Sequence, residues 1–376
     1  MSGPLKGIRV VEMAGIGPAP FCAMMLADMG AEVIRIDRLT ESLLGSGGTV
    51  VDRGRRTIAL DIKKDHAKEI LHKLIARSDV LIEGFRPGVM EKLGLGPDVC
   101  FEQNPKLIYS RMTGWGQTGL LSKTAGHDIN YLSLTGVLHA MGQADRPPAP
   151  PLHLVGDQGG GAMMLAFGIV CALFEAQKSG KGQVIDAAIS DGASTLGSIY
   201  HSLLEQGKWQ NQREANLLDG GAPFYTCYTC KDGKYISIGA IEPQFYQLLL
   251  EKCELTDPIF ARQMDKSAWP EIKQKFTELF KSKTRQEWCE LLEGTDACFA
   301  PVLDFEEAAS HPHNTSRNNF IKINGMTAPA ASPRLSRTPA TPGEIFKNGH
   351  HTAEILNELG YGNDDLEKFR QIGLIK

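Results

Sequence analysis

The sequence has almost no excess of one charge, which narrows the classes of ligand it can attract. Its 40 Lys and Arg residues nearly balance 44 Asp and Glu residues, so the formal net charge is only −4 at pH 7. A chain with this balance has no general attraction for nucleic acid or for an anionic membrane surface. We therefore expect no nucleic-acid partner, and any anion site must come from a local cluster of Arg and Lys.

The sequence also lacks a long hydrophobic segment and a secretory leader. Its longest apolar run, residues 159–174, is shorter than the roughly 20 residues that cross a bilayer, so we expect a buried helix and no membrane insertion. The amino-terminal residues contain no basic start followed by an apolar stretch. The chain ends in Gly-Leu-Ile-Lys and not in a peroxisomal signal of the Ser-Lys-Leu type. We expect a cytoplasmic enzyme or, in a eukaryote, a peroxisomal or mitochondrial one.

Several catalytic signatures are missing. No Gly-x-Ser-x-Gly elbow and no phosphate-loop Gly-Lys-Ser/Thr motif occurs, which excludes the commonest hydrolase and nucleotide-hydrolysing classes. The histidines have no carboxylate or thiol partners at ligand spacing, so we expect no metal site. The eight cysteines are spread thinly, as in a reduced protein. Cys227 and Cys230 fall in a hairpin pattern, where residues three apart face opposite sides, so we interpret them as structural.

Strand-like and helix-like segments alternate through the first half of the chain, which is typical of a parallel α/β sheet. The later pattern, a hairpin followed by helices, predicts a smaller α+β domain. The polar segment 208–214 is typical of a linker, and 324–347 of an extended connector. The predicted strands of the first half are 8–13, 32–36, 57–62, 80–85, 107–112 and 184–189, and the predicted helices are 18–29, 65–76, 160–178 and 193–206.

The segment after the first predicted strand imitates a dinucleotide-binding fingerprint. Gly15 and Gly17 begin it, a helix follows, and Asp37 ends the next strand. However, Pro20 replaces the third glycine, and Arg38 follows the acidic residue at once. We interpret the segment as a Gly-Pro turn that starts a helix, whose free N–H groups could still face an anionic ligand.

Basic residues recur at the predicted strand ends and in the loops after them. In an α/β sheet these ends bind ligands, and guanidinium groups match phosphate oxygens bidentately. Any one of these residues alone is better explained as a solvated surface group, whereas the cluster favours a phosphorylated carrier. Its members include Arg35, Arg38, Arg53, Arg55, Arg56, Lys63, Lys64, Arg86 and Lys92.

Two acid-base side chains occur in glycine-containing contexts before apolar helical stretches. His127 lies in Ala-Gly-His-Asp-Ile-Asn-Tyr, and Asp157 lies in Leu-Val-Gly-Asp-Gln-Gly-Gly-Gly. Imidazole and carboxylate exchange protons near neutral pH, and neighbouring glycines let the backbone approach a ligand. Taken singly, His127 is more simply a histidine near a helix start and Asp157 a helix N-cap. Together they predict a two-base active site.

Seven motifs occur in order along the chain. They are Gly15-Ile-Gly-Pro-Ala-Pro, Arg35-Ile-Asp-Arg, Phe85-Arg-Pro-Gly-Val, Met112-Thr-Gly-Trp-Gly-Gln-Thr-Gly, Gly126-His-Asp-Ile-Asn-Tyr, Leu218-Asp-Gly-Gly-Ala-Pro-Phe-Tyr and Gly239-Ala-Ile-Glu-Pro-Gln-Phe-Tyr. With these motifs the chain resembles the family III CoA-transferases and, within them, the α-methylacyl-CoA racemases. The resemblance runs from about residue 5 to about residue 337.

The resemblance implies a Rossmann-like large domain, a small α+β domain and two chains interlocked as a homodimer. The large α/β CoA-binding domain is expected over residues 1–190, with 330–376 returning to it, and the small domain over 225–316. Linkers are expected over 191–224 and 317–329. Glu242 is expected to reach the active site from the partner subunit, so that the dimer holds two equivalent sites.

The resemblance also implies the chemistry. An acyl-CoA substrate loses its C2 proton to one base, forms an enolate and regains a proton on the opposite face from the other. CoA is part of the substrate, and no further cofactor is required. His127 and Asp157 match the family's two bases. Asp128 and Glu242 match groups that orient His127 or tune it, and Tyr131 supports the same pocket.

Further roles follow from the same resemblance. Backbone N–H groups around Asp128 match the site that stabilises the enolate oxygen. The expected CoA phosphate ligands are Arg38, Arg55, Arg56, Lys63, Arg86 and Lys92.

Two other functions remain open from the sequence. A family III CoA-transferase would use Asp128 to attack the thioester and carry the acyl group as a mixed anhydride. It would have no need of an imidazole base at position 127, where this chain has histidine. A catalytically silent CoA-binding protein would keep the basic cluster and lack both bases. The pair His127 and Asp157 therefore favours the racemase.

Overall fold

The computed structural model describes residues 3–40 and 48–376, and the chain divides into two compact units. The first unit contains residues 1–135, 152–197 and 318–376, and the second contains 136–151 and 198–317. The chain therefore passes between the two units four times. Residues 136–151, which the sequence analysis placed in the large domain, cluster with the second unit.

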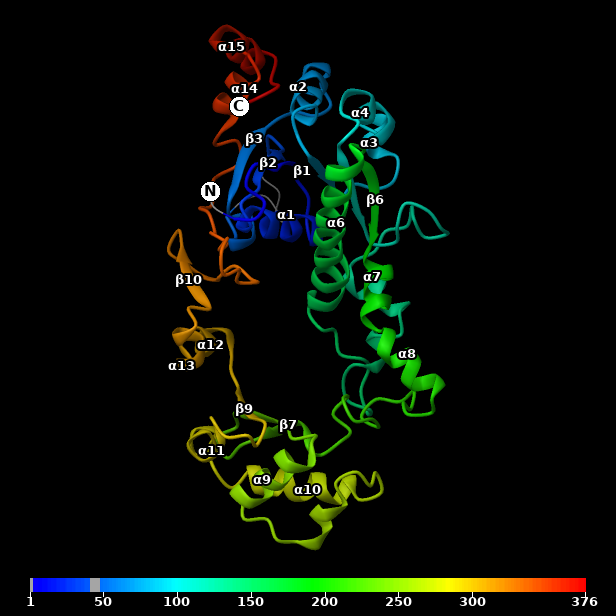
Figure 1. Ribbon diagram of the computed structural model, residues 1–376, viewed down its shortest axis with the longest axis vertical. Helices are drawn as coiled ribbons and strands as arrows, with labels where there is room; N and C mark the ends of the chain where they lie inside the picture. Colours follow the sequence, from blue (N-terminus) through cyan, green and yellow to red (C-terminus); the bar gives the residue numbers. More distant parts are fainter. Residues whose placement is uncertain (1–2, 41–47) are drawn as a thin grey trace. The chain divides into compact units, whose positions relative to one another are not determined.

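A six-stranded parallel sheet forms the centre of the first unit, in the order β3-β2-β1-β4-β5-β6 (Figure 1). The chain moves outward from β1 to β3, then returns to the other side of β1 and continues to β6. This confirms the predicted α/β class with a doubly wound order. The strands are β1 (Arg9–Met13), β2 (Glu32–Asp37), β3 (Arg55–Ala59), β4 (Val80–Glu83), β5 (Ile108–Thr113) and β6 (Gln183–Ala188).

Helices cover both faces of this sheet. Most match the predicted segments within a few residues, but the long segment 154–179 begins as a π-helix, η3, before it becomes α6. The elements are α1 (Pro18–Asp28), η1 (Val50–Asp52), α2 (Asp65–Ile75), α3 (Val89–Lys92), α4 (Pro97–Gln103), α5 (Asp128–Ser133), η3 (Leu154–Met163), α6 (Met164–Ser179), α7 (Ile189–Leu196), the hairpin β10 (Phe320–Ile323) and β11 (Met326–Pro329), α14 (Thr352–Glu358) and α15 (Asn363–Gln371).

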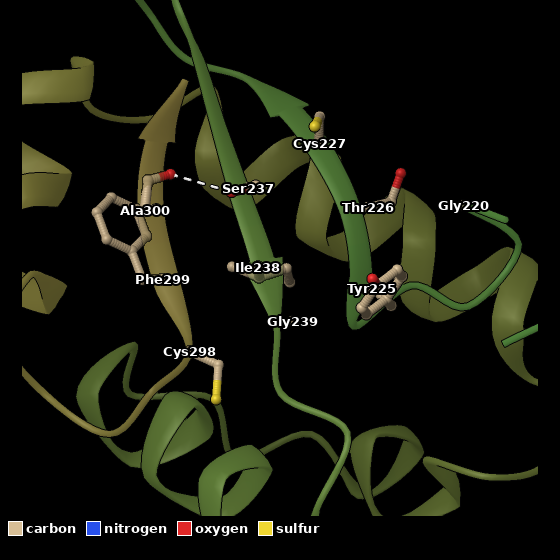
Figure 2. Close-up of a pocket in the computed structure, with 10 residues that line it drawn as sticks. All are labelled: Gly220, Tyr225, Thr226, Cys227, Ser237, Ile238, Gly239, Cys298, Phe299 and Ala300. Atoms are coloured by element: carbon tan, nitrogen blue, oxygen red, sulfur yellow. Dashed lines mark hydrogen bonds between the residues drawn. The ribbon is translucent and has the colours of Figure 1, made fainter. Parts of the chain in front are cut away.

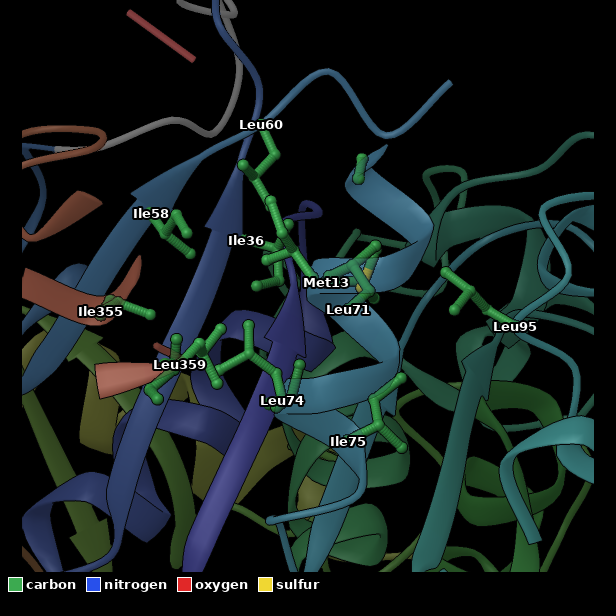
Figure 3. Packing of buried hydrophobic residues seen from close by; sticks show 14 of the residues in the cluster. Met13, Ile36, Ile58, Leu60, Leu71, Leu74, Ile75, Leu95, Ile355 and Leu359 are labelled. Carbon is green, nitrogen blue, oxygen red and sulfur yellow. The ribbon is translucent and has the colours of Figure 1, made fainter. Parts of the chain in front are cut away.

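Alternation along the strands divides the apolar core into two layers, because successive strand residues point to opposite faces. Val11 and Leu81 face one layer, where α2, α14 and α15 pack (Figure 3). Val10 and Ile82 face the other, where α1 and α6 pack. The last forty residues, whose role the motifs left open, therefore complete the first layer: Ile355, Leu359 and Phe369 are buried there.

The second unit is built on a three-stranded antiparallel sheet in the order β7-β8-β9. The predicted hairpin forms: Tyr225 pairs with Gly239 and Thr229 with Tyr235. The helix predicted over 193–206 is in fact two helices, α7 and α8, which belong to different units and are separated at Gly197. The elements are η2 (Leu138–Ala140), α8 (Ser198–Glu205), β7 (Tyr225–Thr229), β8 (Tyr235–Gly239), α9 (Pro243–Lys252), η4 (Pro258–Arg262), α10 (Trp269–Phe280), α11 (Arg285–Leu292), β9 (Phe299–Val302), α12 (Phe305–Ser310) and α13 (Pro312–Ser316).

Candidate active site

A cavity of about 530 Å³ lies at the carboxyl ends of β1, β4 and β5 in the first unit. β1 and β4 are neighbours, but the chain leaves β1 toward β2 and leaves β4 toward β5. This is the topological switch point of the sheet, where α/β proteins bind ligands. The lining residues are Ile16, Gly17, Pro18, Ala19, Gly84, Arg86, Met112, Thr113, Gly114, Gly126, His127, Asp128, Tyr131, His153, Asp157 and Ile189.

The structure brings the two predicted bases together in this cavity. His127 is the residue that precedes α5, where its extended backbone (φ −134°, ψ 175°) ends the preceding loop. Its backbone N–H donates to Oδ1 of Asn130 at 3.1 Å. This bond fixes the backbone at the helix start and leaves the imidazole exposed toward the cavity.

Asp157 lies inside the π-helix η3, not in a loop before a helix as its sequence context indicates. The wider π-helical turn is a geometry that often occurs at functional sites. Gly17, with φ 71°, passes so close that a Cβ at this position would lie 2.9 Å from the Asp157 Oδ2 atom. The glycine that imitated a dinucleotide fingerprint therefore makes room for a carboxylate. Asp37 stands where a dinucleotide-binding fingerprint has the acidic residue that binds the ribose. Here it is buried in an ion pair with Arg35 at 2.7 Å.

The environment of Asp157 makes its carboxyl group a proton donor and acceptor near neutral pH. Burial and, after it, the charge of the nearby Asp128 raise the pKa of Asp157 to about 6, while His153 and His127 act in the opposite direction. A carboxyl group with such a pKa is partly protonated and partly ionised at physiological pH, as an acid-base catalyst requires.

Asp128 connects the two segments that carry the predicted bases. Its Oδ1 atom accepts a hydrogen bond from the backbone N–H of Asp157 at 2.7 Å. Gly156 permits this contact, because a Cβ there would lie 2.1 Å from the same oxygen. Asp128 therefore joins the start of α5 to η3, and this position between the two bases differs from that of a freely exposed nucleophile.

Tyr131 closes one side of the cavity. Its hydroxyl donates to the carbonyl of Gly126, and its ring packs edge-on against Trp115 at a centroid distance of 4.8 Å. Added Cβ atoms at Gly114 or Gly126 would overlap the Tyr131 ring. The glycines of two of the sequence motifs therefore accommodate this aromatic side chain.

The structure divides the basic cluster into two groups. Arg38, Lys63, Arg86 and Lys92 are exposed and lie beyond the carboxyl ends of β2, β3 and β4, and Arg86 lines the cavity. Arg55 and Arg56 instead begin β3, at the amino end of the strand. That edge of the sheet is opposite the edge where α/β proteins bind ligands.

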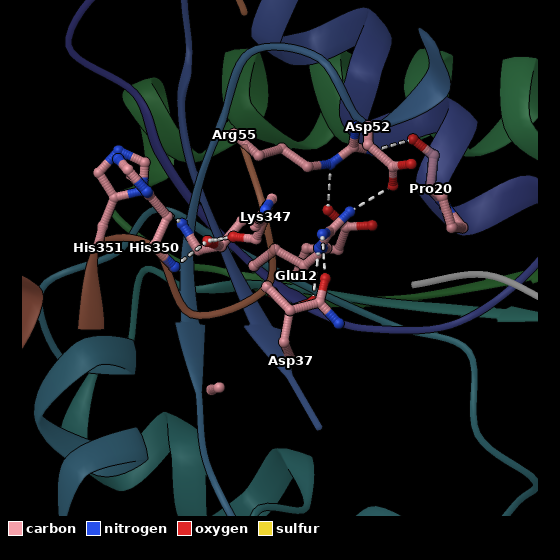
Figure 4. Close-up of polar contacts among 12 residues, drawn as sticks. Glu12, Pro20, Asp37, Asp52, Arg55, Lys347, His350 and His351 are labelled. Atoms are coloured by element: carbon pink, nitrogen blue, oxygen red, sulfur yellow. Dashed lines mark hydrogen bonds and ion pairs between the residues drawn. The ribbon is translucent and has the colours of Figure 1, made fainter. Parts of the chain in front are cut away.

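Arg55 is fully buried and serves the fold. Its Nε atom pairs with Glu12 Oε2 at 2.6 Å, and its other nitrogens donate to the carbonyls of Pro20 and Val51 (Figure 4). Arg56 pairs with Glu32, Glu354 and Glu358, which attach α14 to the sheet. Both guanidinium groups are occupied by these partners. We therefore assign Arg55 and Arg56 a structural role and not the expected role as CoA phosphate ligands.

Glu242 lies in the second unit, where it is exposed and immediately precedes α9. It belongs to the same segment as β8, whose sheet carries a second cavity of about 570 Å³ (Figure 2). Cys227 lines that cavity, whereas Cys230 is buried, and burial raises the pKa of the Cys230 thiol to about 11. A thiol with so high a pKa is a poor nucleophile at neutral pH, which supports the structural interpretation of these cysteines.

His153 is a cavity residue that the sequence analysis included among the histidines without partners at ligand spacing. A signal for it was present: it stands four residues before Asp157, on the segment that carries the carboxylate. Within residues 3–40 and 48–376, no group of three or more His, Cys, Asp and Glu side chains is arranged to hold a metal ion.

The segment of η3 and α6 has an uncovered apolar face. Residues 154–179 are long and apolar enough to cross a membrane by composition alone, but one side of this helix is part of the sheet's core. On the other side Phe167 and Phe174 are 70% and 60% exposed, and Val170 is 46% exposed. The expectation of a buried helix therefore holds for the side that packs on the sheet and is wrong for the other side.

Comparisons with known proteins agree with the fold and show the family. Residues 5–344 match the model of the family described as CoA-transferase family III. The chain is 49% identical to the alpha-methylacyl-CoA racemase of Mus musculus, over 96% of this chain and 95% of that protein. It is 46% identical to the racemase of the same name from Homo sapiens, over 99% and 97%. A CAIB/BAIF family protein from Brucella suis has the same fold, with a TM-score of 0.80, 25% identity, and coverage of 96% of this chain and 100% of that one.

Proposed function

The chain belongs to CoA-transferase family III, and from this premise we propose that it is an isomerase which inverts 2-methylacyl-CoA thioesters at C2. The observation that carries the proposal is the pairing of an imidazole and a carboxyl group of raised pKa in one cavity. Racemisation needs two groups that each accept and return a proton, and His127 and Asp157 are of the right chemical types.

The reaction removes one proton from C2 and adds another proton to the same carbon. In one direction the Asp157 carboxylate removes the C2 proton, the electron pair moves into an enolate, and the His127 imidazolium protonates the opposite face of C2. The reverse direction exchanges the two roles. His127 and Asp157 therefore share one proton before and after the reaction: it is on His127 in one state and on Asp157 in the other. The two groups are expected to titrate as a coupled system.

The enolate oxygen requires stabilisation, since the α-proton of a thioester is only weakly acidic. Backbone N–H groups near Asp128, at the start of α5, are our candidates for this oxyanion site. Tyr131 shapes the same wall of the cavity. The acid-base chemistry comes from the chain's own side chains, and CoA enters as part of the substrate.

The CoA phosphates are proposed to bind the exposed cations at the carboxyl edge of the sheet. Arg38, Lys63, Arg86 and Lys92 remain from the sequence analysis, because each is exposed and follows β2, β3 or β4. Arg86 also lines the cavity, which supports a role close to the thioester end of CoA. Several cations near one crevice suit a ligand with more than one phosphate.

A homodimer is part of the proposal. The exposed side of α6, with Phe167, Val170 and Phe174, is an apolar surface of the kind that a partner chain covers. A second copy would then supply Glu242 to complete the site around His127, where it orients or tunes the imidazole. The prediction is a dimer in solution, measured by light scattering, with loss of racemase activity in Glu242→Ala.

The decisive experiment incubates a single enantiomer of a 2-methylacyl-CoA with the protein in deuterated water, without a carboxylic acid acceptor. Configuration and deuterium content at C2 are followed together. We expect inversion with deuterium incorporation, both lost in His127→Ala and Asp157→Ala. CoA transfer to an added acid, without inversion or exchange, would instead support an Asp128 mixed anhydride and contradict the proposal.

A further inference from the structure

The cavity contains a third ionisable side chain that the two-base scheme does not use. His153 lines the cavity together with His127 and Asp157. Its side chain is exposed. Imidazole is the side chain whose charge ordinarily changes between about pH 5 and pH 8, which overlaps the range in which Asp157 titrates.

The π-helical turn brings His153 and Asp157 to the same wall of the cavity. His153 is the residue before η3, and its carbonyl accepts the N–H of Gln158 at 3.1 Å, a bond that spans five residues. Asp157 is the residue just before Gln158. The turn that this bond closes therefore carries both side chains, and both contribute to the same cavity lining.

The charges around Asp157 act in opposite directions, and His153 belongs to the side that favours the carboxylate. Asp128 disfavours ionisation of Asp157, whereas His153 and His127 favour it, His153 more strongly. Of the other ionisable groups nearby, Tyr131 and Arg86 line the cavity, and Asp191 is exposed on α7, which packs on η3.

The need for a second cation follows from the reaction itself. His127 alternates between imidazolium and neutral imidazole during turnover, so it cannot offer Asp157 a constant positive charge. Asp128 is fixed beside Asp157 by the hydrogen bond from the Asp157 N–H at 2.7 Å. A cation other than His127 would counteract the negative charge of Asp128 at all stages of the reaction, whether His127 or Asp157 carries the proton.

We propose that His153 is a positioning residue of the site, whose imidazolium form holds Asp157 as the carboxylate that removes the C2 proton. The inference rests on the proposed function. When His153 is protonated, the pair His127 and Asp157 keeps its single-proton state to lower pH. His153 thereby extends the acid side of the activity range without touching the reacting carbon.

The test compares His153→Asn, His153→Lys and His313→Asn through the pH profile of kcat/KM for racemisation. His153→Asn removes the charge, so its acid limb moves to higher pH by roughly half to one unit. Activity at pH 5 then falls about three- to tenfold, with little change at pH 8. His153→Lys keeps a positive charge and retains the wild-type limb. His313 is exposed on α13 of the second unit, and its substitution controls for the loss of any surface histidine.

A structural role for His153 predicts a different pattern. Both His153 variants would then lose activity equally at every pH, and that result would overturn the inference, as would an unshifted acid limb in His153→Asn. A second readout is independent of turnover: the Asp157 carboxyl carbon, labelled with carbon-13 and assigned with Asp157→Asn, titrates at higher pH in His153→Asn than in the wild type.

The two readouts separate this inference from the proposed function. If the wild type neither inverts nor exchanges its substrate, the proposed function fails, and the carboxyl titration still decides whether His153 acts on Asp157. If the wild type racemises and the titration does not move, the inference about His153 fails alone.

Discussion

Gly17→Ala is expected to damage the site through one contact. Gly17 has φ 71° and ψ −127°, a conformation that residues with a side chain rarely adopt. An added Cβ would lie 2.9 Å from Asp157 Oδ2, about half an ångström inside ordinary van der Waals distance. Either the α1 turn or the carboxylate must therefore move.

The size of the effect follows from the displacement. A shift of about 1 Å in a catalytic group can cost about 100-fold in rate, so roughly half that shift corresponds to about tenfold in kcat. Backbone strain adds about 1–3 kcal/mol of lost stability. Racemase kinetics measure the first quantity, and urea denaturation followed by circular dichroism measures the second.

Gly94→Ala is the matched control. Gly94 also has φ 71°, but nothing lies within 4 Å of a Cβ added there. This variant should lose stability through strain alone and keep its kcat. If Gly17→Ala retains wild-type kcat, or if Gly94→Ala loses activity to the same extent, the carboxylate is not constrained by Gly17 as the structure indicates.

Three further predictions follow. Arg55→Met leaves Glu12 buried without its partner at 2.6 Å and should lower the free energy of unfolding by about 3–5 kcal/mol. The double variant Glu12→Leu/Arg55→Met should regain much of it, whereas a CoA-binding Arg55 would show a raised KM without lost stability. Wild-type kcat/KM should fall below about pH 6, because Asp157, whose pKa is raised to about 6, becomes protonated and no longer accepts the C2 proton. A pH-independent kcat/KM between pH 5 and 8 would contradict this. Arg86→Ala should raise the KM of the CoA thioester about tenfold through loss of a charged hydrogen bond, whereas Arg146→Ala, exposed in the second unit, should not; equal KM values in steady-state assays would exclude Arg86.

The sequence predicted the parallel sheet well because its strands are buried on both faces. Such strands are short apolar runs, and Val10, Val11, Ile82 and Leu81 all contribute to one core layer or the other. Turn residues marked most helix ends. The prediction failed at residues 193–206, where the helical pattern continues through Gly197 although the chain there passes from one unit to the other. Periodicity reports local geometry and contains no information on which core a helix joins.

The π-helix was beyond sequence reasoning for a related reason. An apolar segment with several glycines is compatible with an α-helix, and only tertiary contacts select the wider turn. Those contacts are close: a Cβ on Gly192 of α7 would lie 1.8 Å from the Gly160 carbonyl oxygen. The glycine run that was attributed to ligand access therefore serves the packing of η3 against α7, which places Asp157 in the cavity.

The prediction of CoA phosphate ligands was wrong at Arg55 and Arg56, because it relied on residue type more than on position in the sheet. The predicted strand 57–62 placed Arg55 and Arg56 outside β3, although they are its first residues. A shift of two residues moves a side chain from a ligand-binding loop to the amino end of a strand. The partner that identifies Arg55 as structural, Glu12, lies 43 positions away, so no local pattern could reveal the pair.

The start of α1 explains why Asp157 keeps a raised pKa although it lies near a helix N-terminus. A carboxylate in that position ordinarily accepts backbone N–H bonds and gains stability from the helix dipole, both of which lower its pKa. Here Pro18 and Pro20 stand in the first turn of α1 and have no N–H to donate. Among the residues that the structure describes, none donates a hydrogen bond to the Asp157 carboxylate, so burial and Asp128 determine the direction of its pKa shift. The two prolines thus remove two of the N–H donors that would otherwise lower the pKa of the Asp157 carboxyl group.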